Sequence, residues 1–186
     1  DRHRICIDNI VLEKTSAPEI DVPVGKNLIT NSEFEMSEDG SLAGWENAVT
    51  APGDATFEAG DGKITYSVEN VGEADWNIQL KQMGLSLEQG ESYTLKCTLV
   101  SDVDRVVKVA VMTPSAGYAW HGGEDVVLTA GEAKDVTLTI TPKEEVFTDG
   151  ITVDTGAGLF FSMGYVEGYT LGAHTVSISN VSFVKN

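Results

Sequence analysis

The sequence is poor in cysteine, in basic residues and in long apolar runs, and each shortage excludes a class of protein. Two cysteines in 186 residues, Cys6 and Cys97, cannot define a disulfide framework. Twelve Lys and Arg against 29 Asp and Glu give a formal net charge of −17, and such a charge repels both nucleic-acid phosphates and anionic membranes. No apolar run approaches the length that spans a bilayer. We therefore expect no nucleic acid and no membrane as partner, whereas neutral polysaccharides and calcium are compatible with the charge.

The residue patterns of common catalytic sites are also missing. His3, His121 and His174 do not have the spacing of metal ligands, and neither a G-x-S-x-G nucleophile motif nor a phosphate-binding glycine loop occurs. The stretch 19–22 (EIDV) is similar to the beginning of the E-x-D-x-x-E strand of jelly-roll glucanases, whose carboxylates flank a glycosidic bond. Pro23 follows, the second glutamate is missing, and proline would interrupt a central strand. We therefore expect a non-catalytic domain, with a jelly-roll hydrolase as the disfavoured alternative.

Apolar and polar residues alternate along much of the chain. Four segments show this period of two, at 93–99, 107–113, 136–141 and 176–181. Enrichment in Val and Thr with one apolar face predicts antiparallel strands. Glycine-containing turn sequences separate the strands, at 38–40, 60–62, 88–90 and 130–132. We predict an all-β fold, a two-sheet antiparallel β-sandwich, and a β-barrel is the open alternative.

The segment 5–14 repeats the pattern of the segment 176–185. Both have Ile at the third place, Asn at the fifth, an aliphatic residue at the sixth and Lys at the tenth. The repeat predicts that residues 1–14 form the closing strand of a truncated upstream module. Residues 15–26, with two prolines and little pattern, then form a linker, and residues 27–186 form one domain. The alternative is a chance similarity between two alternating strands.

Four motifs in order resemble the family 4 carbohydrate-binding modules and their relatives in families 9, 16 and 22. The segment 27–35 matches an N-L-x-x-N-x-x-F-E start, and Gly44-Trp45 follows it. The segment 76–80 matches W-x-x-Q-L, the segment 87–93 matches L-x-x-G-x-x-Y, and the closing strand carries N-V-S at 180–182. The resemblance covers residues 27–186. It implies a β-jelly-roll whose concave sheet binds a single glycan chain in a groove.

The resemblance implies a set of carbohydrate-binding residues. Sugar rings expose C–H patches that stack on aromatic faces, and their hydroxyl groups need amide or carboxylate partners. The expected residues are Trp76, Tyr118, Trp120, Asn77, Gln79 and Thr113. Because Trp76 has the same parity as Ile78 and Leu80, a place in the core is the alternative for this residue. Gly158 and Ser162 stand where some family 4 modules carry two glutamines, and this departure indicates another glycan or a lost affinity.

The resemblance also implies a structural calcium ion remote from the groove. Glu33 and Glu35 are expected to point the same way from one strand, next to carbonyl groups of the turn at Gly62. Ser179 stands where the closing strand of the related modules has an acid. The alternative is that the two glutamates are an exposed strand face.

These observations predict a non-catalytic module of an extracellular, secreted or cell-surface bacterial protein. It would bind plant cell-wall or other β-linked polysaccharide, either β-glucan or xylan, and would hold a catalytic module of the same polypeptide near that substrate. The alternative is a structural or adhesive β-sandwich spacer without affinity for sugar.

Overall fold

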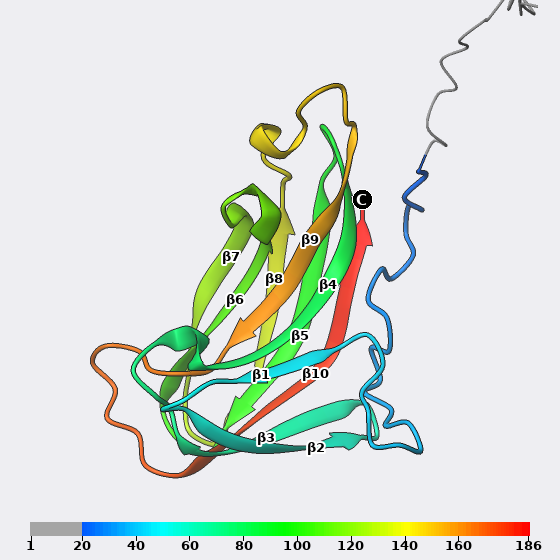
Figure 1. The fold of residues 1–186 in the computed structure, drawn as a ribbon. Helices are drawn as coiled ribbons and strands as arrows, with labels where there is room; N and C mark the ends of the chain where they lie inside the picture. The colour runs from blue at the N-terminus through cyan, green and yellow to red at the C-terminus, as the bar shows by residue number, and fades with distance from the viewer. Residues whose placement is uncertain (1–19) are drawn as a thin grey trace, which may run out of the picture.

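The computed structural model describes residues 20–186, which form two antiparallel sheets packed face to face. The elements are β1 (Glu46–Val49), β2 (Asp54–Gly60), β3 (Lys63–Asn70), η1 (Asp75–Asn77), β4 (Ile78–Glu88), β5 (Tyr93–Ser101), β6 (Arg105–Thr113), η2 (Pro114–Ala116), β7 (Ala119–Leu128), β8 (Lys134–Ile140), η3 (Glu144–Val146), β9 (Val153–Ser162) and β10 (His174–Lys185). One sheet has the strand order β1-β4-β9-β6-β7 and the other β2-β3-β10-β5-β8 (Figure 1). The predicted β-sandwich is therefore confirmed, and the barrel alternative is wrong. No helix among residues 20–186 is long and apolar enough to cross a membrane.

The predicted alternation produces the core, because every second side chain of each strand points between the sheets. The burial of β5 alternates along its length, and its inward residues Tyr93, Leu95 and Leu99 are fully buried. The four predicted strand segments correspond to β5, β6, β8 and β10. The predicted turns are confirmed at Gly90 and Gly131, which have φ angles of +79° and +77°. Glycine adopts such positive φ angles without steric strain.

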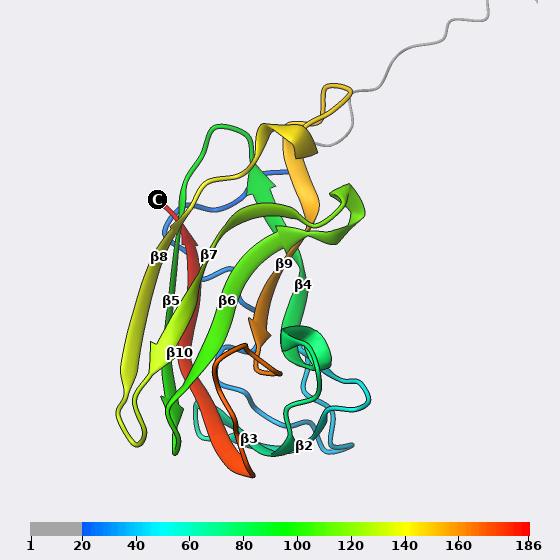
Figure 2. The same cartoon turned by 90° about the vertical axis from the view of Figure 1, so that its left-hand side faces the viewer.

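The two ends of the β1-β4-β9-β6-β7 sheet carry short helical turns. Figure 2 shows β7, β6, β9 and β4 side by side, with η1 at one end of this sheet and η2 at the other. The chain enters β4 from η1, whereas η2 and the residues after it connect β6 to β7. Residues on the two turns are thus separated by most of the length of β6. From Lys108 to Thr113 that length is about 17 Å, at roughly 3.3 Å per residue.

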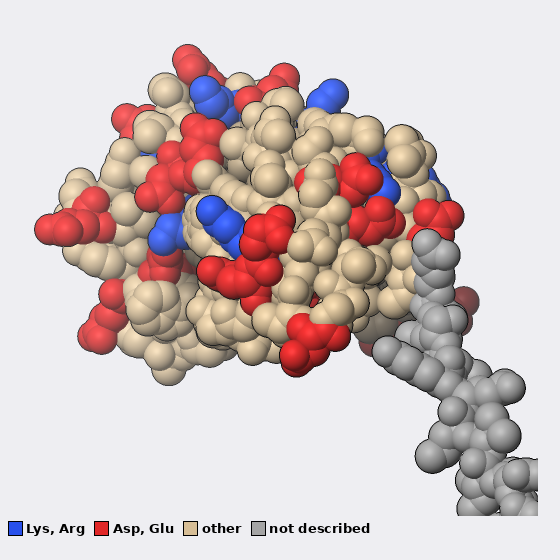
Figure 3. All heavy atoms as spheres, turned by 90° about the horizontal axis from the view of Figure 1, so that it is seen from above, with Lys and Arg blue, Asp and Glu red and all other residues tan. Residues whose placement is uncertain are grey.

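Acidic side chains dominate the charged surface. The view from above the sandwich shows many carboxylates spread over this face and few basic groups among them (Figure 3). This agrees with the net charge of −17. Such a surface favours neutral ligands over anionic ones.

The packed domain begins before Asn27, which corrects the predicted boundary. Val22 is 2% exposed within the core, and its backbone N–H donates to Glu88 Oε1 at 2.9 Å. Val24 pairs with Lys185 of β10, and Gly25 N–H donates to the Lys185 carbonyl oxygen at 3.1 Å. At least residues 22–25 are therefore part of the sandwich and not of a linker, because one buried valine and two backbone pairings hold them to β4 and β10.

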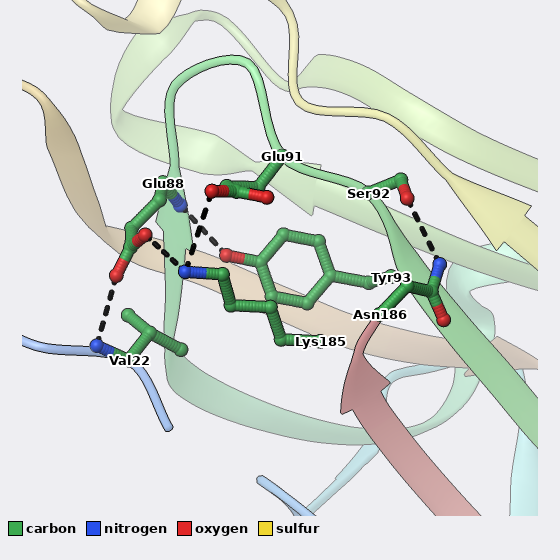
Figure 4. A network of polar contacts seen from close by, with 7 residues as sticks. All are labelled: Val22, Glu88, Glu91, Ser92, Tyr93, Lys185 and Asn186. Atoms are coloured by element: carbon green, nitrogen blue, oxygen red, sulfur yellow. Dashed lines mark hydrogen bonds and ion pairs between the residues drawn. The ribbon is translucent and has the colours of Figure 1, made fainter. Parts of the chain in front are cut away.

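The Lys and Asn that recur between the two ends of the chain have structural roles in β10. The ammonium group of Lys185 contacts Glu88 Oε2, and it lies 3.6 Å from Glu91 Oε1 (Figure 4). The contact with Glu88 raises the pKa of Lys185 and lowers that of Glu88. Asn180 has φ +53° at the bulge between Ser179 and Ser182, a conformation that Asn tolerates better than most residues. The corresponding Asn9 and Lys14 lie outside the described residues, so the upstream strand at 1–14 stays a prediction.

Candidate functional site

The outward face of the β1-β4-β9-β6-β7 sheet presents its side chains in three rows, which the strand register defines. Row one contains Ala48, Gln79, Ser162, Lys108 and Asp125; row two contains Glu46, Lys81, Phe160, Ala110 and Gly123; row three contains Met83, Gly158, Met112 and Trp120. The opposite parity of the same strands fills the core, with Leu80, Val109 and Phe161 each fully buried. We call these three rows the outer face.

Trp76 lies at the row-one end of the outer face and is not a core residue. Its side chain is 63% exposed. The alternative based on parity fails because Trp76 belongs to η1, and strand alternation begins only at Ile78. The preceding residue, Asp75, forms an ion pair with Lys108 of row one, and this contact raises the pKa of Lys108. The ion pair fixes η1, and with it the backbone of Trp76, beside β6.

A buried arginine holds a second loop against η1. Arg105 is completely buried, and its guanidinium donates to the carbonyl oxygens of Met163 and Gly164 and contacts His174 Nε2. Burial lowers the pKa of Arg105 to about 10. In the loop that follows β9, Tyr165 N–H donates to the Ala74 carbonyl oxygen at 3.1 Å. Tyr165 is 40% exposed, so this loop brings a second exposed aromatic residue to the end of the outer face that holds Trp76.

Tyr118 and Trp120 lie at the other end of the outer face. Tyr118 follows η2 with φ +61°, and its side chain is 62% exposed. Trp120 is 41% exposed and stands opposite Met112 in row three. A Cβ built on Gly123 would come within 2.6 Å of Trp120 Cζ2, so the indole lies over the backbone of its own strand. The structure therefore places Trp76 at one end of the outer face, and Tyr118 and Trp120 together at the other.

Gln79 lies on the outer face, and its partner occupies one of the positions that depart from the family pattern. Gln79 Nε2 donates to Ser162 Oγ at 2.9 Å, across the β4–β9 pairing. Gln79 is half-buried, whereas Ser162 is 4% exposed. The side-chain carbonyl oxygen of Gln79 can still accept a hydrogen bond from a ligand.

Asn77 and Thr113 do not present their side chains to the outer face, and their predicted role is corrected. Asn77 is 7% exposed: its Oδ1 accepts from the backbone N–H groups of Glu73 and Ala74 at 2.9 Å, and its Nδ2 donates to Thr50 Oγ1 at 3.1 Å. These bonds fix the loop before η1. Thr113 is 2% exposed and belongs to the inward parity of β6.

Thr113 is the centre of a buried polar relay. Lys143 N–H donates to His121 Nδ1 at 3.0 Å, so Nε2 carries the ring proton and donates to Thr113 Oγ1 at 2.8 Å. The Thr113 hydroxyl donates to Asp154 Oδ2. Burial lowers the pKa of His121, which keeps the imidazole neutral. The relay connects β6, β7 and β9, and Thr113 at its centre is 2% exposed.

Row three contains residues that the sequence-based prediction missed. Met83 is 42% exposed, and Met112 is half-buried on the other side of Gly158 in the same row. Both have the parity opposite to the core residues of their strands, and this parity is visible in the sequence. Methionine has no fixed place in the family pattern of aromatic and amide residues, so the resemblance does not point to these two positions.

The expected calcium ligands lie around one surface hollow, on a turn and not on a strand. Glu33 and Glu35 line the hollow with Asp61 and Gly62, although Phe34 between the glutamates has φ +53° and belongs to no strand. Gly62 N–H donates to the Glu33 carbonyl oxygen at 3.0 Å, so the turn and the glutamates are held together. Ser179 pairs with Lys63, directly after the turn.

The fit of calcium to this hollow is incomplete. Carboxylate and carbonyl oxygens are the donors that calcium prefers, and Glu33, Glu35 and Asp61 supply them. Within residues 20–186, however, no group of three or more His, Cys, Asp or Glu side chains is arranged to hold one metal ion. Calcium at this hollow is therefore a proposal that requires a rearrangement of exposed carboxylates.

Comparison with known proteins identifies the family. The family model described as "Carbohydrate binding domain" (CBM_4_9) matches residues 26–155, and no curated protein sequence matches the chain. A structure described as "CBM4 structure and function" has a TM-score of 0.66 and 19% identity, covering 85% of this chain and 99% of that one.

Two cellulose-binding domains of Cellulomonas fimi β-1,4-glucanase C also have the same fold. The N-terminal domain has a TM-score of 0.60 and 20% identity, covering 87% of this chain and 98% of that one. The second domain has a TM-score of 0.59 and 23% identity, covering 86% and 94%. At these identities the structures establish the jelly-roll fold alone. The match of the family model over residues 26–155 shows that this chain belongs to the CBM_4_9 family of carbohydrate-binding domains.

Proposed function

We propose that this domain binds a single chain of a neutral β-linked polysaccharide, a β-glucan or a xylan, along the outer face. The observation that carries the proposal is the placement of exposed aromatic side chains at both ends of one sheet face. Trp76 is 63% exposed at one end, and Tyr118 is 62% exposed at the other. One sugar ring cannot reach both positions, whereas an extended glycan chain lying along β6 contacts both.

The chemistry of the outer face suits a neutral glycan. Aromatic rings stack on the C–H faces of sugars, and amide and charged groups bind their hydroxyls. Gln79, Lys108 and Lys81 supply such groups in rows one and two. The excess of carboxylates over the surface disfavours an anionic chain (Figure 3). A few stacked rings correspond to dissociation constants of roughly micromolar to millimolar order.

Binding without catalysis gives the domain a targeting role. The similar domains of Cellulomonas fimi are cellulose-binding parts of a β-1,4-glucanase. By analogy, this domain holds a glycoside hydrolase of the same polypeptide at plant cell-wall polysaccharide and raises the local concentration of substrate. Such a protein is secreted or displayed on the surface of a bacterium.

A spacer without sugar affinity is the second candidate, and one observation favours it. Gly158 and Ser162 stand where some related modules carry glutamines, and Ser162 is 4% exposed and bonded to Gln79. Affinity electrophoresis in gels that contain xylan, mixed-linkage β-glucan or laminarin separates the two candidates. Retardation by at least one polymer, lost in Trp76→Ala and Tyr118→Ala, supports binding. Equal mobility of the native domain in all gels and in a gel without polymer supports the spacer.

A further inference from the structure

The outer face divides into a polar part and an apolar part. Row one, and row two on β1 and β4, carry amide, hydroxyl and charged side chains, among them Gln79, Lys81 and Lys108. Toward the Tyr118 end the outward-facing residues change in character. We define the apolar strip as Met83, Ala110, Met112, Trp120, Gly158 and Phe160, which lie on the four neighbouring strands β4, β9, β6 and β7.

Two glycines, Gly158 in the apolar strip and Gly123 beside it, let larger side chains lie directly over the backbone. A Cβ on Gly158 would lie 2.5 Å from Met83 Sδ and 3.0 Å from Phe160 Cε2, so the thioether of Met83 lies directly over the backbone of β9. The indole of Trp120 covers Gly123 in the same way, on β7. Phe160 faces outward and is still only 3% exposed, which means that its neighbours cover it. The surface that a ligand meets is therefore formed mainly by Met83, Met112 and Trp120.

This surface is poorly suited to unmodified sugar hydroxyls. A hydroxyl pressed against thioether and aromatic carbon loses its hydrogen bonds to water and gains none in return. The indole N–H of Trp120 is the only strong hydrogen-bonding group among the side chains of the strip, and it can only donate. An ester-linked acetyl group has the complementary properties, since it offers a methyl group and a carbonyl oxygen that only accepts. Methionine side chains also adapt to small, irregular apolar shapes.

We propose that the apolar strip makes this domain selective for O-acetylated polysaccharide, with Met83, Met112 and Trp120 receiving the acetyl methyl groups. The inference rests on the proposed function, because it assigns the class of glycan bound at the same outer face. The polar side chains of row one, with Glu46 and Lys81 of row two, hold the unsubstituted hydroxyls of the same chain. Acetylation leaves the glycan neutral, which agrees with the acidic surface.

The test compares one glycan with and without its esters. Soluble acetylated xylan and acetylated glucomannan are each divided in two, and one half is treated with mild alkali, which removes the esters and leaves the glycosidic bonds. Dissociation constants of the native domain are measured by calorimetry for all four samples. We expect deacetylation of the bound glycan to weaken binding roughly fourfold for each methyl group withdrawn from the strip.

Two variants identify the strip as the cause. Met83→Gln, which keeps the length of the side chain, should move the ratio of the two dissociation constants toward one. Val24→Gln is the control, because Val24 is 67% exposed and pairs with β10 of the other sheet, and it should keep the native ratio. Equal or tighter binding of the deacetylated glycan, or the same ratio in Met83→Gln and the control, overturns the inference and leaves the proposed function standing. Failure to bind either form, or any neutral glucan, overturns both.

Discussion

Replacing Trp76 by alanine should weaken glycan binding without loss of stability. A tryptophan side chain buries roughly 200 Å² when it is fully covered, and Trp76 is 63% exposed. If a stacked sugar covers about half of the remaining area, roughly 60 Å² is withdrawn from water, which at about 25 cal/mol per Å² corresponds to about 1.5 kcal/mol. The dissociation constant should therefore rise about 12-fold.

The stability of the same variant should change little, because an exposed indole contributes little to the core. A surface substitution of this kind stays within about 0.5 kcal/mol, or a shift of about 1–2 °C in melting temperature for a domain of this size. Calorimetric titration with the polymer that retards the native domain, together with a thermal melt, measures both quantities. A fall in melting temperature of several degrees without a change in affinity would refute the placement of Trp76 in the binding site.

The adjacent residue provides the matched control. Asn77→Ala removes the bonds to Glu73, Ala74 and Thr50, and it leaves the part-buried N–H donors of Glu73 and Ala74 without partners. Such a loss corresponds to about 1–3 kcal/mol, so the melting temperature should fall by several degrees. Trp76→Ala should thus weaken glycan binding with little change in melting temperature, whereas Asn77→Ala should lower the melting temperature.

Three further predictions concern other parts of the fold. If calcium binds between Glu33 and Glu35, calcium should raise the melting temperature and a chelator should reverse the rise. Glu33→Gln should abolish this response. A melting temperature of the native domain that does not change with calcium would contradict the site. Because burial lowers the pKa of His121 below its ordinary value of 6.5, its contribution to the free energy of unfolding is complete above pH 6.5 and is lost as the pH falls through the lower pKa of the folded protein. Urea midpoints at pH 7.5 and 5.5 should therefore differ less in His121→Asn than in the native domain, and an equal difference would contradict the assignment. Burial raises the pKa of Cys97 to about 12, so iodoacetamide at pH 8 should alkylate Cys97 in urea but not in the folded domain, and rapid labelling of the folded domain would disprove its burial.

The strands could be predicted from the sequence because their signal is local. Apolar residues alternate with mainly Thr, Ser or Lys in β5, β6, β8 and β10, and the alternation determines which side chains face the core. Glycine marked the turns where φ is positive, as at Gly90 and Gly131. The start of the domain was misplaced because Val22 is a single apolar residue between polar and proline residues. A single residue has no period, and its burial depends on long-range contacts with β4 and β10.

The placement of the candidate binding residues was predicted in part, for a related reason. The motif around Trp76 and the glycine-rich loop before Trp120 pointed to three aromatic residues that are exposed at the two ends of one sheet. The sequence did not show that the side chain of Asn77 would be fully engaged in hydrogen bonds within its own loop. It also did not show that Thr113 would bond to His121 inside the sandwich. The bonds of Asn77 depend on the geometry of the loop before β4, which strand parity does not determine. The inward direction of Thr113 does follow the parity of Val107, Val109 and Val111, but its partners on β7 and β9 depend on long-range contacts. The outward direction of Met83 could be read from its parity, but its position over Gly158 could not be read from the sequence.

The three tryptophans provide the most direct test of binding at the outer face, because each gives one indole N–H signal in a proton–nitrogen spectrum. Trp45 is 7% exposed, and its Nε1–H donates to the Asn31 carbonyl oxygen at 3.0 Å, whereas Trp76 and Trp120 lie at opposite ends of the outer face. Titration with a soluble oligosaccharide of the polymer that binds should shift the signals of Trp76 and Trp120 and leave that of Trp45 in place. Saturation of the domain with no movement of either exposed indole would contradict the proposed binding face.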